Sequence, residues 1–289
     1  MQGTVDGFSY GLVTPLVAYL MACLGGALGL RCTTRAMLVG GSWRIGWLAL
    51  GSAAIGSGIW TMHFVAMMGF KVVETPVHYD APTTFASLAV AIVMVGIGIF
   101  MVASKGATGA ALFSGGAITG LGIASMHYLG MAGMRLNGRL EYNTVTVAAS
   151  VAIAVVAAIA ALWAAGQVRG FLWSVGASLV MGVAVSGMHY TGMAALSVRL
   201  HAMTDATPAG DSPATLLAPL MVGPLLFLLL AGAVVMFDPL MIMDKARGVP
   251  VERRPGIPAH TVTAHTTRRP LARIGRQRGD RSTRTPQNW

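Results

Sequence analysis

SGMHYTGMAAL, residues 186–196, closes a long apolar stretch with a histidine, a tyrosine and two methionines. Nearly the same pattern closes two earlier apolar stretches, TMHFVAMMGF at 61–70 and SMHYLGMAGM at 125–134. The three segments align without gaps on their histidines, which are His63, His127 and His189. Their intervals of 64 and 62 residues indicate an internal repeat, because self-similarity at a fixed period is characteristic of repeated structural units.

The chain around these motifs has the composition of a protein that crosses a membrane several times. Of its 289 residues, 55% are hydrophobic and only 10% are charged, whereas soluble domains carry about 25% charged residues. Seven apolar runs reach the roughly 20 residues that a bilayer-crossing helix needs: 8–30, 43–69, 83–103, 108–134, 144–165, 171–196 and 214–237. We therefore expect an all-α membrane domain over residues 8–237, with seven transmembrane helices in a threefold repeat of a two-helix unit plus a seventh helix.

The period of the repeat covers two membrane crossings, so the three motif-bearing helices are expected to run in the same direction. Each histidine lies about seven residues before the expected end of its helix, which corresponds to roughly 10 Å. The three imidazoles are therefore predicted at one depth. The methionine four positions after each histidine shares its helix face, whereas the methionine directly before it lies on the flank.

Imidazole and thioether groups together are soft to borderline ligands. They suit copper, above all Cu(I), and they suit haem iron as axial ligands. Magnesium and calcium prefer oxygen ligands, and no span carries Asp or Glu at the depth of the histidines. A repeated packing motif is the alternative, because methionine fills gaps between helices. Three histidines at one depth favour a metal or cofactor site.

Hydroxyl groups beside the histidines could contact whatever the site binds. Tyr128 and Tyr190 directly follow the second and third histidines and could donate a hydrogen bond to a bound ligand or ligate weakly. Thr191 could orient a neighbouring group.

Other functional classes find little support. Cys23 and Cys32 are nine residues apart, which matches neither a redox CxxC motif nor a zinc site. No nucleophile, zinc-protease or nucleotide-binding motif occurs in a suitable context, so we do not expect an enzyme. Eleven of the twenty Lys and Arg residues lie between Lys245 and Arg284, so the net charge of +10 describes a tail and not a nucleic-acid-binding domain.

The distribution of Lys and Arg predicts the orientation in the membrane. One side would hold sixteen of them: Arg31, Arg35, Arg44, Lys105, Arg169 and the eleven in the tail. The other side would hold four: Lys71, Arg135, Arg139 and Arg199. We expect the N-terminus outside and the C-terminus in the cytoplasm, with the histidines near the outer face. Residues 245–289 are expected to be a disordered basic cytoplasmic tail, which could contact anionic lipid headgroups.

MHYT at 188–191, preceded by MHF at 62–64 and MHY at 126–128, resembles the motif of the bacterial MHYT domain family, and the resemblance covers roughly residues 8–200. Members of that family look like integral sensor modules of the bacterial plasma membrane. The resemblance implies copper near the outer face and a diatomic gas, such as oxygen, CO or NO, as the sensed ligand. It also implies a separate cytoplasmic signalling partner for a chain without an output domain.

Carried over to this sequence, the resemblance implies metal ligands in each repeat: Met62, His63 and Met67; Met126, His127 and Met131; Met188, His189 and Met193. The first copy departs from the motif with Phe64 and Val65, and the second with Leu129. A role for hydroxyl groups would therefore rest on Tyr128, Tyr190 and Thr191.

Several functions remain open. A copper-containing membrane sensor of gas or redox state explains why the donors cluster at one depth. A copper transport or delivery protein would need donors along a path, and the inner halves of the spans offer only scattered methionines. A bis-His haem protein is compatible with three histidines, and a catalytic oxidase finds least support. Histidine nitrogens more than about 10 Å apart would exclude a single metal site, since metal–nitrogen bonds are close to 2 Å long.

Overall fold

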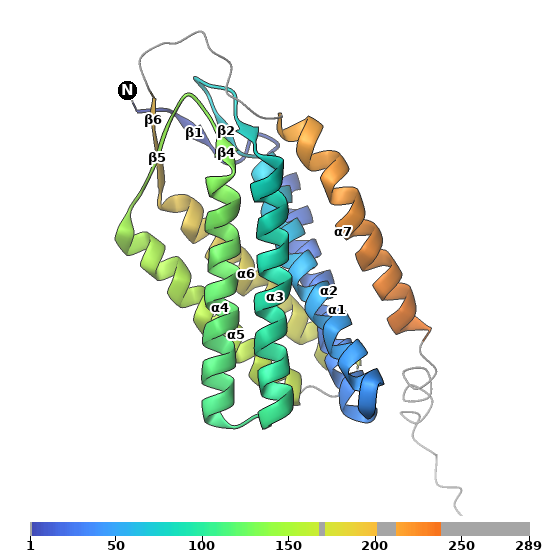
Figure 1. Ribbon diagram of the computed structural model, residues 1–289. Coiled ribbons are helices and arrows are strands. Elements are labelled where there is room, and N and C mark those ends of the chain that lie inside the picture. Colours follow the sequence, from blue (N-terminus) through green and yellow to red (C-terminus); the bar gives the residue numbers. More distant parts are fainter. Residues whose placement is uncertain (1, 168–170, 201–211, 238–289) are drawn as a thin grey trace, which may run out of the picture. The chain divides into compact units, whose positions relative to one another are not determined.

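The computed structural model describes residues 2–167, 171–200 and 212–237 (Figure 1). Its helices are α1 (Val13–Leu38), α2 (Gly41–Met68), α3 (Ala81–Lys105), α4 (Gly109–Ala132), α5 (Thr144–Gln167), α6 (Phe171–Ala194) and α7 (Pro213–Met236). All seven are long and apolar enough to cross a membrane, which confirms the predicted multi-pass fold. The expected tail, residues 245–289, lies outside the described residues, as does Arg169.

Six of the seven predicted spans agree with the helices to within two residues at each end. The prediction for the first span, 8–30, is wrong at both ends. Gly11 adopts a φ of +61°, so the helix begins only after it. The helix then continues for about two turns through Arg31 and Arg35. Long basic side chains near a helix end can extend out of the apolar region, so they do not end the helix.

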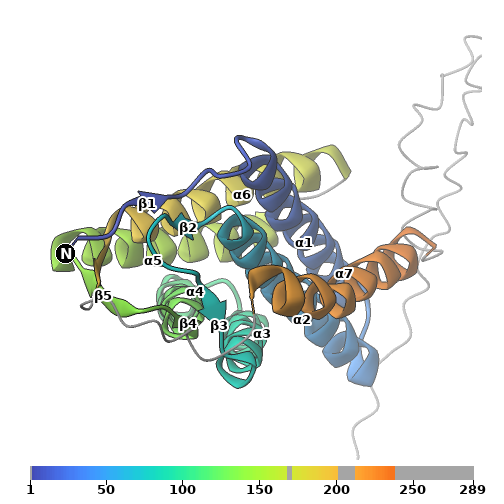
Figure 2. The same ribbon diagram turned by 90° about the horizontal axis from the view of Figure 1, so that it is seen from above.

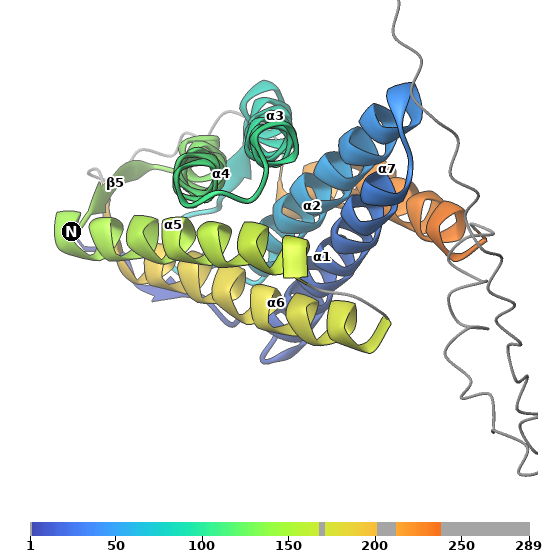
Figure 3. The ribbon, with the colours of Figure 1, turned by 90° about the horizontal axis from the view of Figure 1, so that it is seen from below.

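Helices α1 to α6 form a closed ring in which each helix contacts the next and α6 contacts α1 (Figure 3). The motif-bearing helices α2, α4 and α6 also contact one another, and α7 lies outside the ring against α1 and α2. The most enclosed span is α2, with 78% of its most apolar window buried, against 22–50% for the other six. This arrangement is the predicted threefold repeat of a two-helix unit plus a seventh helix.

Glycines allow the helices of neighbouring repeats to approach closely. One glycine lies seven residues before the histidine in each motif helix: Gly56, Gly120 and Gly182. A Cβ at these positions would come within 3.0 Å of Ile92 on α3, of Val155 on α5 and of Cys23 on α1, respectively. At Gly56 and Gly120 the nearest atoms are backbone atoms, which cannot rotate away, so these two helix contacts have a spacing that only glycine permits.

Short strands that were not predicted lie at the end of the bundle where α2, α4 and α6 finish, which we call the strand-bearing end (Figure 2). They are β1 (Val5–Asp6), β2 (Lys71–Val72), β3 (His78–Tyr79), β4 (Met134–Arg135), β5 (Gly138–Tyr142) and β6 (Leu196–Leu200). Antiparallel pairs form between β1 and β2, between β3 and β4, and between β5 and β6.

These pairs link the repeats to one another. The β3–β4 pair joins the segments that follow α2 and α4, and the β5–β6 pair joins those that follow α4 and α6. The third link is made by residues 2–9, the N-terminal strap. Gly3 donates its backbone N–H to the carbonyl of Val198 at 2.8 Å, and Ser9 donates to the carbonyl of Gly69 at 3.0 Å. The strap therefore closes the gap between the ends of α6 and α2.

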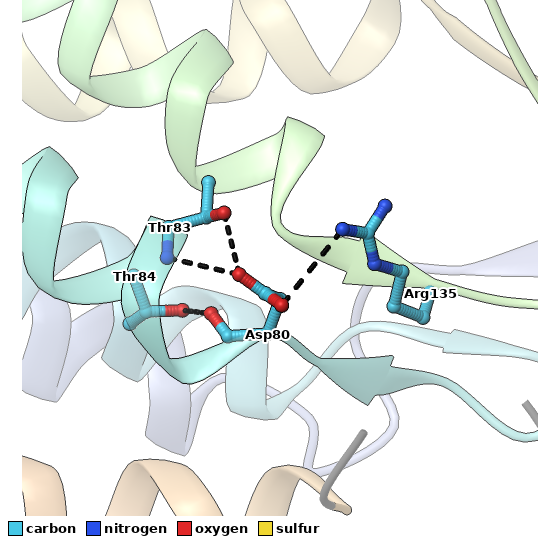
Figure 4. Close-up of polar contacts among 4 residues, drawn as sticks. All are labelled: Asp80, Thr83, Thr84 and Arg135. Carbon is cyan, nitrogen blue, oxygen red and sulfur yellow. Dashed lines mark hydrogen bonds and ion pairs between the residues drawn. The ribbon is translucent and has the colours of Figure 1, made fainter. Parts of the chain in front are cut away.

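The start of α3 is fixed by Asp80 (Figure 4). Its Oδ2 atom accepts hydrogen bonds from the hydroxyl of Thr83 at 2.6 Å and from the amide of Thr83 at 3.0 Å. These two bonds, followed by the charge of Arg135, hold the pKa of Asp80 below its usual value. Asn143 occupies the same place before α5 and accepts from the amide of Thr146 at 3.1 Å. The capping residues thus repeat with the same period as the histidines.

Candidate metal centre

The three histidines lie at one depth in the bundle. His63 on α2, His127 on α4 and His189 on α6 are each five residues before the end of their helix. At the rise of an α-helix this places them roughly 8 Å inside the helix ends. The expected depth of roughly 10 Å was slightly too large, because these helices stop one or two residues earlier than predicted.

The three imidazoles meet inside the ring. Nδ1 of His63 lies 3.1 Å from Nδ1 of His189 and 3.2 Å from Nδ1 of His127, and the His189–His127 pair is 3.3 Å apart. The rings stand at 78–89° to one another, with centroids 4.9–5.1 Å apart. Each histidine is 1% exposed. The nitrogens are therefore far closer than the separation that would exclude a single site.

This triangle has dimensions that fit a metal ion. Its centre is about 1.8 Å from each Nδ1 atom, and metal–imidazole bonds are about 2.0–2.1 Å long. An ion near the centre could accept a lone pair from all three nitrogens. Within the described part of the chain, these histidines are the one group of three or more His, Cys, Asp or Glu side chains that could hold a metal.

Hydrogen bonds among the imidazoles cannot satisfy all of them. A neutral imidazole has one N–H donor and one lone pair. The Nε2 atoms of His63 and His127 are buried without a hydrogen-bond partner among residues 2–167, 171–200 and 212–237. With the protons on Nε2, three Nδ1 lone pairs face one another. A cation at the centre would convert this repulsion into ligation.

Two glycines pack against the Nε2 edges of two of the imidazoles. A Cβ on Gly130 of α4 would lie 2.6 Å from Nε2 of His63, and a Cβ on Gly192 of α6 would lie 2.5 Å from Nε2 of His127. The glycine three residues after one histidine thus makes room for the histidine of the preceding repeat. Any larger side chain there would have to displace an imidazole.

The methionines predicted as ligands are mostly enclosed in the bundle. Those that directly precede the histidines are at most 1% exposed: Met62, Met126 and Met188. Met67 and Met131 are 1% exposed, and Met193 is partly buried. Whether their sulfur atoms ligate stays a prediction.

The predicted hydroxyl groups have different surroundings. The hydroxyl of Tyr128 shares a 2.6 Å hydrogen bond with Ser150 on α5, so it links α4 to α5. Tyr190 stacks on Phe8 of the strap, with ring centroids 5.8 Å apart. Thr191 is partly buried on α6. A role for these groups toward a bound ligand stays a prediction.

Sequence reasoning missed two buried serines on the helices without motifs. Ser150 bonds to Tyr128, and Ser87 on α3 accepts a hydrogen bond from Nε1 of the buried Trp60 at 3.0 Å. Both serines are fully buried and lie 63 residues apart. Aligning the helices without motifs on the same period would have found them.

An apolar cavity of about 270 Å³ lies on the other side of the histidine cluster from the strands. It begins at Met188, directly before His189, and is lined by side chains such as those of Ile59, Val95 and Ile123. Arg44 contributes to its far end. The lining offers few polar groups along this direction.

The family model described as "MHYT: Bacterial signalling protein N terminal repeat" matches residues 56–115 and 120–178. These two matches contain the first and second histidine motifs. The third motif lies outside both, and the structure brings its histidine into the same cluster. No solved structure matches the chain.

Curated relatives are much longer proteins. The chain is 37% identical over 207 residues to the bifunctional diguanylate cyclase/cyclic di-GMP phosphodiesterase MucR of Pseudomonas aeruginosa, covering 70% of this chain and 30% of that protein. It is 36% identical over 217 residues to the cyclic di-GMP phosphodiesterase NbdA of the same organism, and 29% identical over 210 residues to the signaling protein YkoW of Bacillus subtilis. These alignments cover 27% and 26% of those proteins. The chain thus spans less than a third of each relative, and the similarity is to their sensor region.

Proposed function

The chain belongs to the MHYT family of bacterial signalling domains, and on this basis we propose that it is a membrane sensor module that holds copper between His63, His127 and His189. The sensed input is a diatomic gas (oxygen, CO or NO) or a change in redox state. The observation that carries the proposal is the triangle of Nδ1 atoms with sides of 3.1–3.3 Å. A bound copper ion would supply one-electron redox chemistry and affinity for small gas molecules.

Copper is favoured over zinc by the residues around the triangle. Three imidazoles suit both metals, but thioethers select Cu(I). Met62 and Met126 are fully buried next to the ligating histidines, where a soft metal could use them.

The packing of the imidazoles disfavours the haem alternative. Two axial nitrogens on one iron are about 4 Å apart, and the porphyrin must pass between them. Here three rings contact one another with centroids 4.9–5.1 Å apart, which leaves no space for a macrocycle. The transport alternative has equally little support, because the cavity beyond the cluster is lined mostly by alkyl groups.

Signalling would use the contacts that join the repeats. Gly130 and Gly192 place the helix of one repeat directly against the imidazole of the preceding repeat. A change in the spacing of the imidazoles would therefore shift α2, α4 and α6 relative to one another. We propose that a cytoplasmic signalling partner responds to this shift. Two of the relatives are named as cyclic di-GMP enzymes, which is consistent with such a partner.

We propose the predicted orientation as well, with the strand-bearing end outside and the membrane domain spanning residues 8–237. In the described chain, the positive charges gather at the two ends of the bundle. Four lie on strands at the strand-bearing end: Lys71, Arg135, Arg139 and Arg199. Four lie at the opposite end: Arg31, Arg35, Arg44 and Lys105. The eleven Lys and Arg residues within 245–289 add to the positive charge of the end opposite the strands, which favours a cytoplasmic C-terminus.

The test is metal analysis and visible spectroscopy of protein purified in detergent. We expect one copper ion per chain, a spectrum that changes when oxygen, CO or NO is added, and loss of copper in His127→Ala. The matched control is His78→Ala, which removes a histidine on β3 outside the cluster and should retain copper. Zinc in place of copper, a haem spectrum, or equal copper in both variants would overturn the proposal.

A further inference from the structure

The three histidines are not equivalent at their outer edges. Gly130 and Gly192 close off the Nε2 edges of His63 and His127. The corresponding residue of the first repeat, three positions after its histidine, is Ala66. Ala66 and His189 line a common cavity of about 340 Å³. The third imidazole therefore borders an open space where the other two border a helix backbone.

We call this cavity the His189 vestibule; besides Ala66 and His189, its lining includes Met67, Met193, Tyr190 and Phe8. Nδ1 of His189 is turned toward the other histidines, so the edge of the ring available to the vestibule is the one that carries Nε2. Two methionines and one histidine thus line a single space. Such a donor set suits a soft monovalent cation such as Cu(I) or Ag(I).

We infer that the His189 vestibule is the route by which a soft monovalent metal ion reaches the histidine cluster, with Met67 and Met193 as its transit ligands. This inference rests on the proposed copper site. It assigns these two methionines to the path of the metal, separately from the final ligands at the triangle. Met131, the matching residue of the second repeat, lies outside the lining of the vestibule, so the route follows the side of the ring that carries α2 and α6.

The N-terminal strap covers the vestibule. Phe8 stacks on Tyr190 at an interplanar angle of 19°, and Phe8 itself is 52% exposed. The strap is attached on the α2 side by the amide of Thr4, which donates to Glu74 at 2.8 Å. Hydrogen bonds from the side chain and then the backbone of Thr4 hold the pKa of Glu74 below its usual value. The vestibule is thus covered by the stacked pair of Phe8 and Tyr190, and the hydrogen bond of Thr4 holds the strap in place. Phe8 stays partly in contact with solvent.

The first experiment measures the rate of Cu(I) transfer from a coloured Cu(I) chelator to the metal-free full chain in detergent. Met193→Leu and Met67→Leu keep an apolar side chain of similar volume but lack the sulfur. We expect each to slow loading by about tenfold, the size of effect typical of removing a supporting group at a metal site, with the final copper content unchanged. Phe8→Ala should speed both loading and removal by the chelator.

The matched control is Met68→Leu, which removes the sulfur of the next residue along α2, outside the lining of the vestibule. It should load at the wild-type rate. Equal slowing in Met68→Leu and Met193→Leu would overturn the inference, as would unchanged loading in both Met67→Leu and Met193→Leu.

A second experiment needs no metal and separates failure of the route from failure of the copper site. Diethyl pyrocarbonate modifies accessible neutral imidazoles, and peptide mass spectrometry can locate the product. We expect modification of His189 to be several-fold faster than that of His63 or His127, and faster still in Phe8→Ala. Selective modification of His189 without copper binding would refute the copper proposal but support the vestibule. Equal modification of the three histidines would refute the vestibule.

Discussion

Substituting Gly130 by alanine tests whether the helix backbone sets the position of an imidazole in the cluster. The new Cβ would lie 2.6 Å from Nε2 of His63, about 0.8 Å short of the 3.4 Å at which ordinary contact begins. Metal–ligand distances tolerate deviations of about 0.2 Å. Since His63 is packed against the rings of His127 and His189, a shift of this size must disturb the triangle. We expect Gly130→Ala to weaken copper binding by about 10- to 100-fold.

The assay is a competition titration against a Cu(I) chelator, with thermal unfolding followed by circular dichroism. Alanine is favoured over glycine inside a helix by about 1 kcal/mol, so loss of helix propensity cannot explain weaker binding. The matched control is Gly187→Ala on α6, where a Cβ would meet nothing within 4 Å. If folded Gly130→Ala bound copper as tightly as Gly187→Ala, the argument that the backbone positions His63 would be refuted.

Three further predictions concern the frame around the cluster. Ser150→Ala removes the partner of the Tyr128 hydroxyl and should destabilise the fold by about 1–2 kcal/mol in detergent unfolding, with much less effect when Tyr128→Phe is already present. Asp80→Asn should keep the helix cap at neutral pH. Hydrogen bonds from Thr83 lower the pKa of Asp80. The stability that the Asp80 carboxylate gives to the fold is therefore present above its usual pKa of 3.8 and is lost as the pH falls through the lowered value. Melting curves of Asp80→Asn should lack this acid-dependent loss. Gly58→Val adds a Cβ 2.7 Å from a Cα atom of α1 and should cost about 1–3 kcal/mol or more, seen as loss of the monodisperse peak in size-exclusion chromatography.

The seven helices and the histidine cluster were predictable because each leaves a strong pattern in the sequence. Spans of about 20 apolar residues can be found without knowing their neighbours. The three motifs align without gaps, and the two-helix period forces their helices to run in the same direction. A common depth for His63, His127 and His189 follows from these two facts alone.

The strands could not be predicted because their partners are remote. Strands β1 to β4 have two residues each, and their pairing depends on how the ring brings the helix ends together. The sequence also shows that the repeats differ at the position three residues after the histidine, but it does not show what this difference means. Ala66 replaces the glycines at the matching positions 130 and 192, yet only the structure shows that these positions face the histidine of another repeat.

The strap has a consequence for the order of events during synthesis. Gly3 bonds to Val198, so the strap must wait for a partner made almost 200 residues later. Contacts of such sequence separation form late, because the intervening chain must first be ordered. All three histidines precede residue 198, so the cluster can assemble while its outer side is still uncovered. Maturation would then offer the nascent protein a window for acquiring the proposed metal, which closes when strand β6 pairs with the strap.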